Sequence, residues 1–574
     1  MSEQNDQHND PVFDEEQAHL KELYAKLLRM RDDIAADLES NHAGARQDLL
    51  DMSEEVRLDF GGADETMETL AAIETLNSVI DAYNQYHDFN VEKLRRVVLL
   101  LMQPYFAKVR LQMRPGRPAR DVYIGAAGMT DEHSIPLVVD WRSPVAETYY
   151  NQEMGPTSYE VDGRKRTVNL ELRRQFDIVR DKLNMYFDTT VAIEDSLLLG
   201  ALKRHHSEKL QAITATIQRE QNLIVRHEDV PVMLVNGIAG SGKTSVLLQR
   251  IAFLLYRERK TLDPDQVYLF TPNNVFERYI DTVLPSMGEA NPQVFTWRDF
   301  AEAHERIDDL SWLRFDRIGM RLLGQPALSA TEWIYLRLCI TGAGDKNARY
   351  VMVDEVQDYT VAQLMVLARH FSRAHFLLLG DEHQAIFEGT ATFAQMREVF
   401  EATHGQVEEC RLLTSYRSSP EITAMFTSLL DPDEQMRLTS VHRGGVAPVV
   451  REFAADDVDG YVAELRRIAE GAADAEGLTA IVTESDPRCG WLAKQLGDRV
   501  EVLGKDSDLP KSGVVLLPLR VAKGLEFDEV VIPDAQAEVY PDTPLARRRL
   551  YTAISRAMHR VTVLSQGPMT PLLA

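Results

Sequence analysis

The stretch Gly237-Ile-Ala-Gly-Ser-Gly-Lys243-Thr244 has the residue types and spacing of a loop that binds phosphate groups. It follows the apolar run 232–235 and precedes the helix-like run 246–256, the context that such a loop requires. The glycines let backbone N–H groups close around a β-phosphate, and the positive end of the helix dipole adds to the attraction. Lys243 can reach the β- and γ-phosphates, and the Thr244 hydroxyl can bind Mg²⁺. The stretch therefore predicts a protein driven by ATP and Mg²⁺, although a glycine turn can also merely pack a helix on a strand. The predicted contacts of the loop are Gly237, Ile238, Ala239, Gly240, Ser241, Gly242, Lys243, Thr244 and Ser245.

Two later apolar runs end in polar residues that could complete such a site. Asp354 and Glu355 follow Val351-Met-Val, where Asp354 can hold Mg²⁺ and Glu355 can polarise the attacking water as general base. A surface acidic turn gives the same pattern, but the position after a phosphate loop favours catalysis. Gln384 follows the run Leu377-Leu-Leu, and its amide could contact a γ-phosphate.

Phosphoryl transfer also needs cations over the developing charge. The candidates are Arg417 and Arg556, each of which taken alone would be an ordinary surface arginine. Tyr416 could stack on adenine, and the turn that contains Gly524 places Glu526 for a ribose hydroxyl. These residues can act only if a second sheet domain faces the first across the nucleotide.

Composition and charge narrow the class of protein. The chain has 574 residues, 44% of them apolar, and a net charge of −26, which predicts three or four domains of ordinary globular type. The first 92 residues hold 23 Asp/Glu against 6 Lys/Arg, a balance unsuited to binding phosphate backbones. We find no signal peptide and no membrane-spanning run, and Cys339, Cys410 and Cys489 lie far apart. We therefore expect a cytoplasmic protein with reduced thiols and no membrane partner.

The elements that would position these residues begin with a helical arm. Residues 1–13 are acidic and predict a disordered tail. Apolar stripes Leu20–Leu38 and Leu70–Tyr83, separated by a break at 60–63, predict an antiparallel helical hairpin, with a possible kink at 41–44. Its tip is acidic, and the candidate functional carboxylates are Glu54, Glu55, Asp59, Asp64 and Glu65. A solvated charged turn is the simpler alternative.

A β-rich segment follows the arm. Strand patterns occur at 122–124, 137–139 and 167–172, with a hairpin turn at Asp162-Gly163. We expect Asp140-Trp141-Arg142 to stabilise this module through packing and an ion pair. The basic run 164–166 is expected to be solvated, with a docking patch as the alternative. Residues 181–230 are predicted to be helical, and strand and helix patterns alternate from 232 onward, as in a parallel α/β sheet.

The ordered motifs resemble superfamily 1 helicase motors of the UvrD/Rep type over roughly residues 215–565. This resemblance implies that Gln221 reads adenine, with Gln218 as its competitor. Arg250 is also predicted to belong to the nucleotide-binding set. The resemblance also implies that Lys243 and Thr244 bind phosphate and Mg²⁺, and that Asp354 and Glu355 are the metal ligand and the base. Gln384 would contact the γ-phosphate, and Arg417 and Arg556 would be the arginine fingers. Only 57 residues separate Thr296 from Asp354, which leaves little room for duplex-handling insertions. Pro518-Leu-Arg520 replaces the family's Thr-x-His, a departure that counts against DNA tracking.

The N-terminal third resembles HelD proteins, helicase-like ATPases that bind bacterial RNA polymerase. The resemblance rests on Tyr123-Ile-Gly125, Leu137–Val145, the lead-in Asp195–Leu199 and Ala215–Gln221. It implies that the acidic arm enters the polymerase secondary channel, that DNA or RNA is met within the polymerase complex, and that the protein is nucleoid-associated through polymerase. The alternatives are a single-stranded DNA translocase in repair and a nucleotide-gated scaffold with little turnover.

The predicted fold class is α/β, with two RecA-like P-loop NTPase domains preceded by an antiparallel helical hairpin and a small β-rich module. The predicted divisions are a tail at 1–13, the arm at 14–105, the β-rich module with connecting helices at 106–205, a first RecA-like domain at 206–405 with a short insertion near 298–345, and a second at 406–574.

Overall fold

The computed structural model divides into two compact units. The N-terminal unit comprises Met1–Leu202, Glu208–Gln218 and Ser286–Gly288, and the C-terminal unit comprises the remaining residues. The structure describes residues 10–55, 84, 86–150, 154–161, 163–188, 217, 219–272, 280, 283–285, 287–305, 314–435, 438–440, 445–473, 477–504, 509–510 and 512–573.

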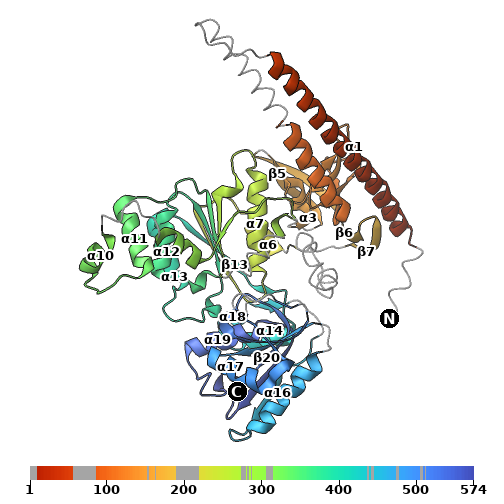
Figure 1. Ribbon diagram of the computed structural model, residues 1–574. Coiled ribbons are helices and arrows are strands. Elements are labelled where there is room, and N and C mark those ends of the chain that lie inside the picture. Colours follow the sequence, from red (N-terminus) through yellow and green to blue (C-terminus); the bar gives the residue numbers. More distant parts are fainter. Residues whose placement is uncertain are drawn as a thin grey trace. The chain divides into compact units, whose positions relative to one another are not determined.

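A long helix leads the N-terminal unit (Figure 1). Helix α1 (Pro11–Glu55) passes through 41–44 as one helix and begins within the expected tail. Its stripe is confirmed because Leu20, Leu23 and Leu27 are buried against the helical residues 86–102 and the neighbouring sheet. The predicted second stripe, 70–83, lies outside the described residues.

The β-rich module is a seven-stranded sheet of order β3-β4-β2-β1-β6-β5, with β7 pairing β6. The strands are β1 (Ala107–Gln112), β2 (Arg120–Gly125), β3 (Met129–Thr130), β4 (Pro136–Asp140), β5 (Gly155–Val161), β6 (Arg164–Val179) and β7 (Lys182–Asp188). The predicted strands are confirmed, but the helix predicted from 181 is wrong at its start. Arg180 has φ +57°, and this tight turn pairs Val179 with Lys182 and continues the sheet as β7.

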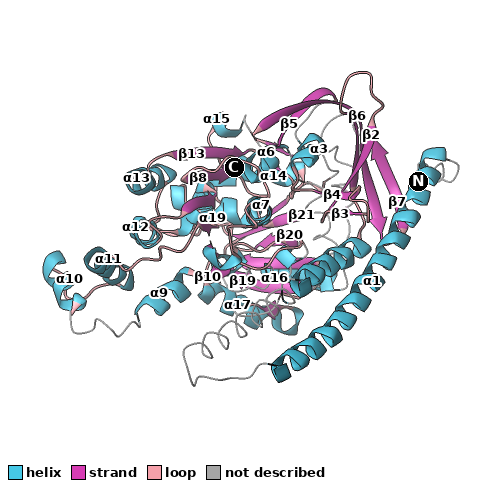
Figure 2. Ribbon diagram, turned by 90° about the horizontal axis from the view of Figure 1, so that it is seen from above, coloured by secondary structure: helices cyan, strands magenta, loops and turns pink. Residues whose placement is uncertain are grey.

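Charged side chains fix α1 to this sheet, and Figure 2 shows the helix running beside β7. The buried Glu16 carboxylate accepts hydrogen bonds from Lys108 of β1 and from Arg174 of β6, the latter at 2.7 Å. The Gln17 side-chain amide donates to the Asp181 carbonyl in the β6–β7 turn and accepts from the Leu183 amide of β7. Asp140 and Arg142 form the predicted ion pair, with Nη2–Oδ2 at 2.7 Å, beside the buried Trp141.

The C-terminal unit contains two parallel sheets. The first has the order β10-β9-β11-β12-β8-β13. It is built from β8 (Val232–Gly237), β9 (Val267–Phe270), β10 (Gln293–Phe295), β11 (Tyr350–Val353), β12 (His375–Gly380) and β13 (Val407–Leu412). Because β13 pairs with β8, this sheet extends seven residues past the expected boundary at 405. Its helices are α6 (Arg219–Val225), α7 (Lys243–Arg257), α9 (Trp297–Glu305), α10 (Phe315–Leu323), α11 (Ala330–Thr341), α12 (Val361–His370) and α13 (Phe393–His404).

The second parallel sheet has the order β16-β21-β20-β17-β19-β18. Its strands are β16 (Val449–Phe453), β17 (Leu478–Thr483), β18 (Glu501–Val502), β19 (Gly513–Pro518), β20 (Phe527–Ile532) and β21 (Ala557–Gln566). Its helices are α14 (Pro420–Thr427), α16 (Val458–Ala473), α17 (Asp486–Leu496), α18 (Leu519–Ala522) and α19 (Pro544–Ile554). Two sheets of this kind, with polar residues at their strand ends, confirm the predicted α/β class.

The cysteines carry free thiols, as expected. Among the described residues, no helix is both long and apolar enough to span a bilayer.

Candidate nucleotide site

The predicted phosphate loop connects β8 to α7, which begins at Lys243. Gly240 and Gly242 have φ angles of +74° and +77°, which side-chain-bearing residues rarely adopt. A Cβ at Gly240 would lie 2.5 Å from the Ser415 hydroxyl, and one at Gly242 would lie 2.7 Å from the Gln221 amide nitrogen. The glycines are therefore required both for the turn and for the close approach of two neighbouring segments.

Lys243 and Thr244 occupy the start of α7. The Lys243 ammonium donates to the carbonyls of Gly237 and Ile238 at 2.8 and 3.2 Å, and lies 4.0 Å from the Asp381 carboxylate. Burial lowers the pKa of Lys243, and the Asp381 carboxylate opposes that shift. The Thr244 hydroxyl donates to Asp354 at 2.8 Å, so the two oxygens predicted to hold Mg²⁺ are adjacent.

Asp354 and Glu355 follow β11 and are buried. Burial, with the adjacent Glu355 charge, raises the pKa of Asp354 to about 6. Burial also acts to raise the pKa of Glu355, but Lys523, Lys243 and Arg556 outweigh it and lower that pKa. Glu355 therefore remains an ionised acceptor. Its φ of +51° is a strained conformation of the kind that concentrates at functional sites.

The donor set fits Mg²⁺. This ion usually takes one or two protein oxygens and completes its shell with water and substrate phosphates. Within the described part of the chain, no group of three His, Cys, Asp or Glu residues forms a metal cage. The buried Ser241 hydroxyl has no hydrogen-bond partner within the protein, so the loop retains a polar group for a ligand.

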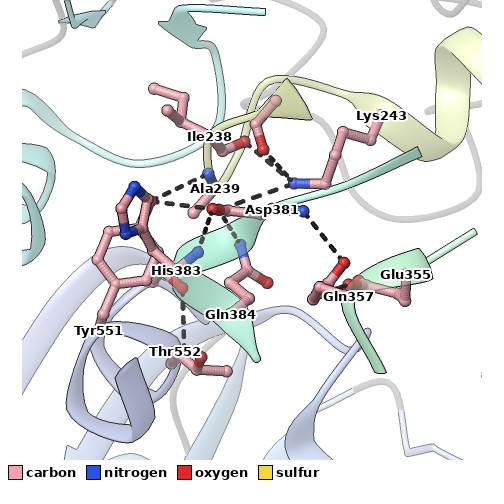
Figure 3. A network of polar contacts seen from close by, with 12 residues as sticks. Ile238, Ala239, Lys243, Glu355, Gln357, Asp381, His383, Gln384, Tyr551 and Thr552 are labelled. Atoms are coloured by element: carbon pink, nitrogen blue, oxygen red, sulfur yellow. Dashed lines mark hydrogen bonds and ion pairs between the residues drawn. The ribbon is translucent and has the colours of Figure 1, made fainter. Parts of the chain in front are cut away.

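A buried relay joins this loop to the second sheet (Figure 3). Gln384 donates to Asp381 at 2.8 Å and accepts from Arg556 at 2.6 Å. Tyr551 of α19 donates to Asp381 at 3.3 Å and accepts from the backbone amide of Ala239 at 3.4 Å. Side chains from the domains of both sheets thus meet within hydrogen-bonding distance of the phosphate loop.

Lys523 makes a second connection between the sheets. Its ammonium donates to Asp358 at 2.5 Å and to the Gln384 carbonyl at 2.6 Å. Gln357 donates to Glu355 and accepts from the Asp381 amide at 3.1 Å, so it orients the predicted base against the relay.

The segment between the two sheets carries Tyr416 and Arg417. Glu220 of α6 accepts from the Tyr416 hydroxyl at 2.9 Å and from the amides of Leu413 and Thr414 at 3.3 Å. The Tyr416 amide donates to the Gly240 carbonyl at 2.9 Å. The next residue on α6, Gln221, donates to the Ser241 carbonyl at 2.8 Å. One helix therefore holds both the phosphate loop and the connecting segment.

The structure brings most of the residues predicted for the nucleotide site together. Arg417 and Glu526 form an ion pair with each other, next to Gly524, whose φ is +82°. Ser245 lies in the first turn of α7.

Arg250 requires a correction. Its guanidinium donates to the carbonyls of Val225 and His227 at 3.0 and 2.7 Å, so it secures the end of α6 instead of facing the loop. Gln218, Asp59, Asp64 and Glu65 lie outside the described residues. Glu54 and Glu55 are the last two residues of α1, and the structure does not describe their side chains.

The sequence reasoning missed four supporting residues: Glu220, Gln357, Asp381 and Tyr551. Asp381 ends an apolar strand within the motif of Gln384, and Tyr551 precedes Arg556 by five residues, so position in these motifs was an available signal. The contacts of Glu220 and Gln357 depend on tertiary structure and left no signal in the pattern.

A cleft of about 470 Å³ lies beside the site. Its lining includes the predicted catalytic pair Asp354 and Glu355, the aromatic Trp297, and the basic Arg298 and Lys523. Arg520, from the motif that departs from the family pattern, also lines it and is paired with Asp486 at 2.5 Å.

Three family models match this sequence. The N-terminal domain of DNA helicase IV HelD matches residues 13–205, an AAA domain matches 221–390, and a UvrD-like helicase C-terminal domain matches 513–564. The matches confirm the resemblance predicted from the motifs: over these segments the chain is similar to HelD-type proteins and to UvrD/Rep-like superfamily 1 helicases. The sequence is thereby related to that of DNA helicase IV.

Individual relatives match only parts of the chain. DNA helicase IV of Escherichia coli (strain K12) is 23% identical over 244 residues, which cover 38% of this chain and 34% of that protein. The chain thus matches about a third of the length of this relative. The C-terminal domain of a possible DNA helicase from Lactobacillus plantarum WCFS1 is 33% identical over 28% of this chain and 92% of that one, with a TM-score of 0.22. The DUF1998 helicase MrfA, solved bound to DNA, is 10% identical over 62% of this chain and 51% of that one, with a TM-score of 0.37.

Proposed function

We propose that this protein hydrolyses ATP with Mg²⁺ and uses the movement of its two sheet domains to act on bacterial RNA polymerase. The observation that carries the first half is the relay in which Arg556, Gln384 and Asp381 join the second sheet to the phosphate loop. A charge that develops on a γ-phosphate at this loop can therefore interact with polar side chains from the domains of both sheets.

Each step of hydrolysis has a candidate residue. Glu355, held by Gln357, accepts the proton of the attacking water. Lys243 leaves the Gly237 carbonyl to pair with the phosphates, and Arg556 and Arg417 place positive charge over the transferred group. Thr244 and Asp354 would hold Mg²⁺, which supplies charge neutralisation on the phosphates when bound. Gln221 and Tyr416 lie on segments that bracket the loop, where they would contact adenine.

Domain movement follows from the same contacts. Tyr551 lies on α19, and Lys523 and Arg556 follow α18 and α19 in the domain of the second sheet. Each bonds to a group that follows a first-sheet strand or lies in the phosphate loop. Loss of the γ-phosphate would change the partners of Gln384 and Arg556 together. We infer that each turnover opens and closes the two sheets.

The polymerase half of the proposal is supported by the HelD N-terminal match and by the acidic, sheet-anchored arm. We propose that the arm enters the secondary channel, that its tip carboxylates approach the polymerase metal site, and that turnover releases or recycles stalled polymerase. This would give the protein a role in transcription and a cytoplasmic location.

The test is co-purification of the full chain with RNA polymerase. Neutralising the tip by Glu54→Gln, Glu55→Gln, Asp59→Asn, Asp64→Asn and Glu65→Gln should weaken binding at least about tenfold, since several charge contacts are lost together. A matched control neutralises five exposed acids of the C-terminal unit: Glu388, Glu398, Glu401, Asp456 and Asp498. Equal binding by the tip variant and the wild type would refute the role of the arm.

A second candidate is a single-stranded DNA translocase in repair. The cleft favours it, because Trp297 could stack on a base while the exposed Arg298 attracts phosphates. This function predicts strong stimulation of ATP turnover by single-stranded DNA with a steep salt dependence.

A further inference from the structure

Two β-hairpins of the N-terminal sheet end at the same side and carry basic residues there. The turn between β1 and β2 follows the pair Leu111–Arg120, and the turn between β5 and β6 follows the pair Val161–Arg164. Because β1 and β6 are themselves paired antiparallel, with Gln112 opposite Asn169, the two turns project from one end of the order β2-β1-β6-β5. We define their basic residues as the basic ridge: Arg114, Arg117, Arg120, Arg164, Lys165 and Arg166.

All six residues of the basic ridge are exposed, and within the described part of the chain none of them forms an ion pair. Asp121, the nearest acid on β2, is already bound to Arg110 and faces Lys108. Glu160 lies opposite Lys165, and Asp162 of the turn lies outside the described residues. Positive charge therefore predominates here, in a chain whose net charge is −26.

Further acids at this end of the sheet lie beyond β4. Asp131 and Glu132 belong to the turn before that strand, and Asp131 is occupied by the backbone amides of His133 and Ile135. Since β4 pairs with β2, this turn borders the ridge on one side only.

The hairpin turns fix the backbone that carries these cations. Gln112 donates to the Arg117 carbonyl at 3.1 Å, and the Arg117 amide donates to the Arg114 carbonyl at 3.1 Å. Gly116 and Gly163 have φ angles of +75° and +70°, as closed turns of this kind require. Cations on an ordered backbone lose less conformational entropy on binding than cations on a flexible loop.

The side-chain types indicate the partner. Five of the six cations are arginines, whose planar guanidinium groups bind phosphate oxygens in pairs. No large apolar side chain is exposed in 112–120 or in the described residues of 154–167, although a protein interface usually centres on such side chains. We propose that the basic ridge binds the phosphate backbone of double-stranded nucleic acid without reading its base sequence.

This proposal goes beyond ATP turnover and can be tested without it. The probe is a fluorescein-labelled 30-base-pair DNA duplex, titrated with the full chain and followed by anisotropy between 50 and 200 mM NaCl. The ridge variant carries Arg114→Gln, Arg117→Gln, Arg164→Gln and Arg166→Gln. We expect its affinity to fall at least about tenfold at the lowest salt, and the slope of log Kd against log salt to fall by about 2–4.

A matched control removes four exposed cations elsewhere, by Lys260→Gln, Arg321→Gln, Lys346→Gln and Lys494→Gln. This control has the same net charge as the ridge variant and should bind within about threefold of the wild type, because phosphate contacts are local. A thermal unfolding profile equal to that of the wild type would show that both variants are folded, because ATP turnover reports on the C-terminal unit alone.

Two outcomes would overturn the proposal. If the ridge and control variants weaken equally, overall charge and not the ridge attracts DNA. If the ridge variant binds the duplex normally but loses RNA polymerase, the ridge binds an acidic protein surface instead.

Discussion

The nucleotide site and the base of the helical arm both bury charged side chains, but they satisfy them differently. At the base of the arm, Glu16 is 2% exposed and its carboxylate is shared by Lys108 and Arg174. At the nucleotide site, Lys243 bonds to carbonyls and Arg556 to an amide, while the hydroxyls of Ser241 and Ser415 have no partner within the protein. At the base of the arm, these charged groups are paired with one another without a ligand, so this region serves to anchor the arm. The nucleotide site retains donors that a phosphate can take, as catalysis requires.

A substitution of Glu355 should have the largest effect among the changes that test this difference between the two regions. Glu355→Gln should lower ATP turnover by at least about a thousandfold while ATP still binds, because the amide keeps the shape but cannot accept a proton. Steady-state phosphate release and equilibrium nucleotide binding measure the two effects. Glu388→Gln makes the same change at an exposed position of the same domain and should have no effect. Turnover at the wild-type rate would remove Glu355 from the role of base.

Arg556 tests whether the second sheet contributes to the chemistry. Arg556→Ala should lower kcat by about a hundredfold to a thousandfold with little change in ATP affinity, because a finger acts on charge that develops in the transition state. Arg560→Ala, at an exposed position of the same strand, serves as the control. If Arg556→Ala changes ATP binding but spares kcat, its bond to Gln384 is structural.

Glu16 tests the anchoring half of the comparison. Glu16→Gln removes the carboxylate that Lys108 and Arg174 share but leaves them paired with Asp121 and Asp188, so it should destabilise the packing of α1 by about 1–3 kcal/mol. Amide hydrogen exchange in residues 11–40 should accelerate, while ATP turnover stays unchanged. Glu15→Gln changes the exposed neighbour on the same helix and should leave exchange at the wild-type rate. Unchanged exchange in Glu16→Gln would show that apolar packing alone holds the arm.

Glu220 is expected to have the smallest effect, because it acts through Tyr416. Glu220→Ala should raise KM for ATP by about two- to tenfold and leave kcat nearly unchanged, since it removes the Tyr416 bond, worth about 0.5–1.5 kcal/mol, together with two longer bonds from backbone amides. Tyr416→Phe should give a similar rise, and the double variant should be no worse than either single change. Glu228→Ala, at an exposed position after α6, is the control. Additive effects would mean that Glu220 and Tyr416 act separately.

The parts that the sequence predicted are those whose chemistry is local. The phosphate loop, the carboxylates after β11 and the glutamine after β12 each combine an apolar strand with the residues that follow it, so spacing alone indicates them. The stripe of α1 was predictable because helical burial repeats every three or four residues.

The parts that it missed depend on contacts between distant segments. Arg250 has the composition of a phosphate ligand, but the carbonyls that end α6 take its guanidinium. The sequence of β7 was predicted to be helical, and only its pairing with β6 shows that it forms a strand. Glu220 and Tyr416 are 196 residues apart, and no local pattern joins them.

ATP turnover by the full chain with RNA polymerase, with single-stranded DNA and with neither is the most direct test of the proposed function. We predict that polymerase raises turnover several-fold, that bare DNA raises it much less, and that neutralising the tip carboxylates removes the polymerase effect. Stimulation by single-stranded DNA alone, with polymerase inert, would contradict the account and favour a DNA translocase.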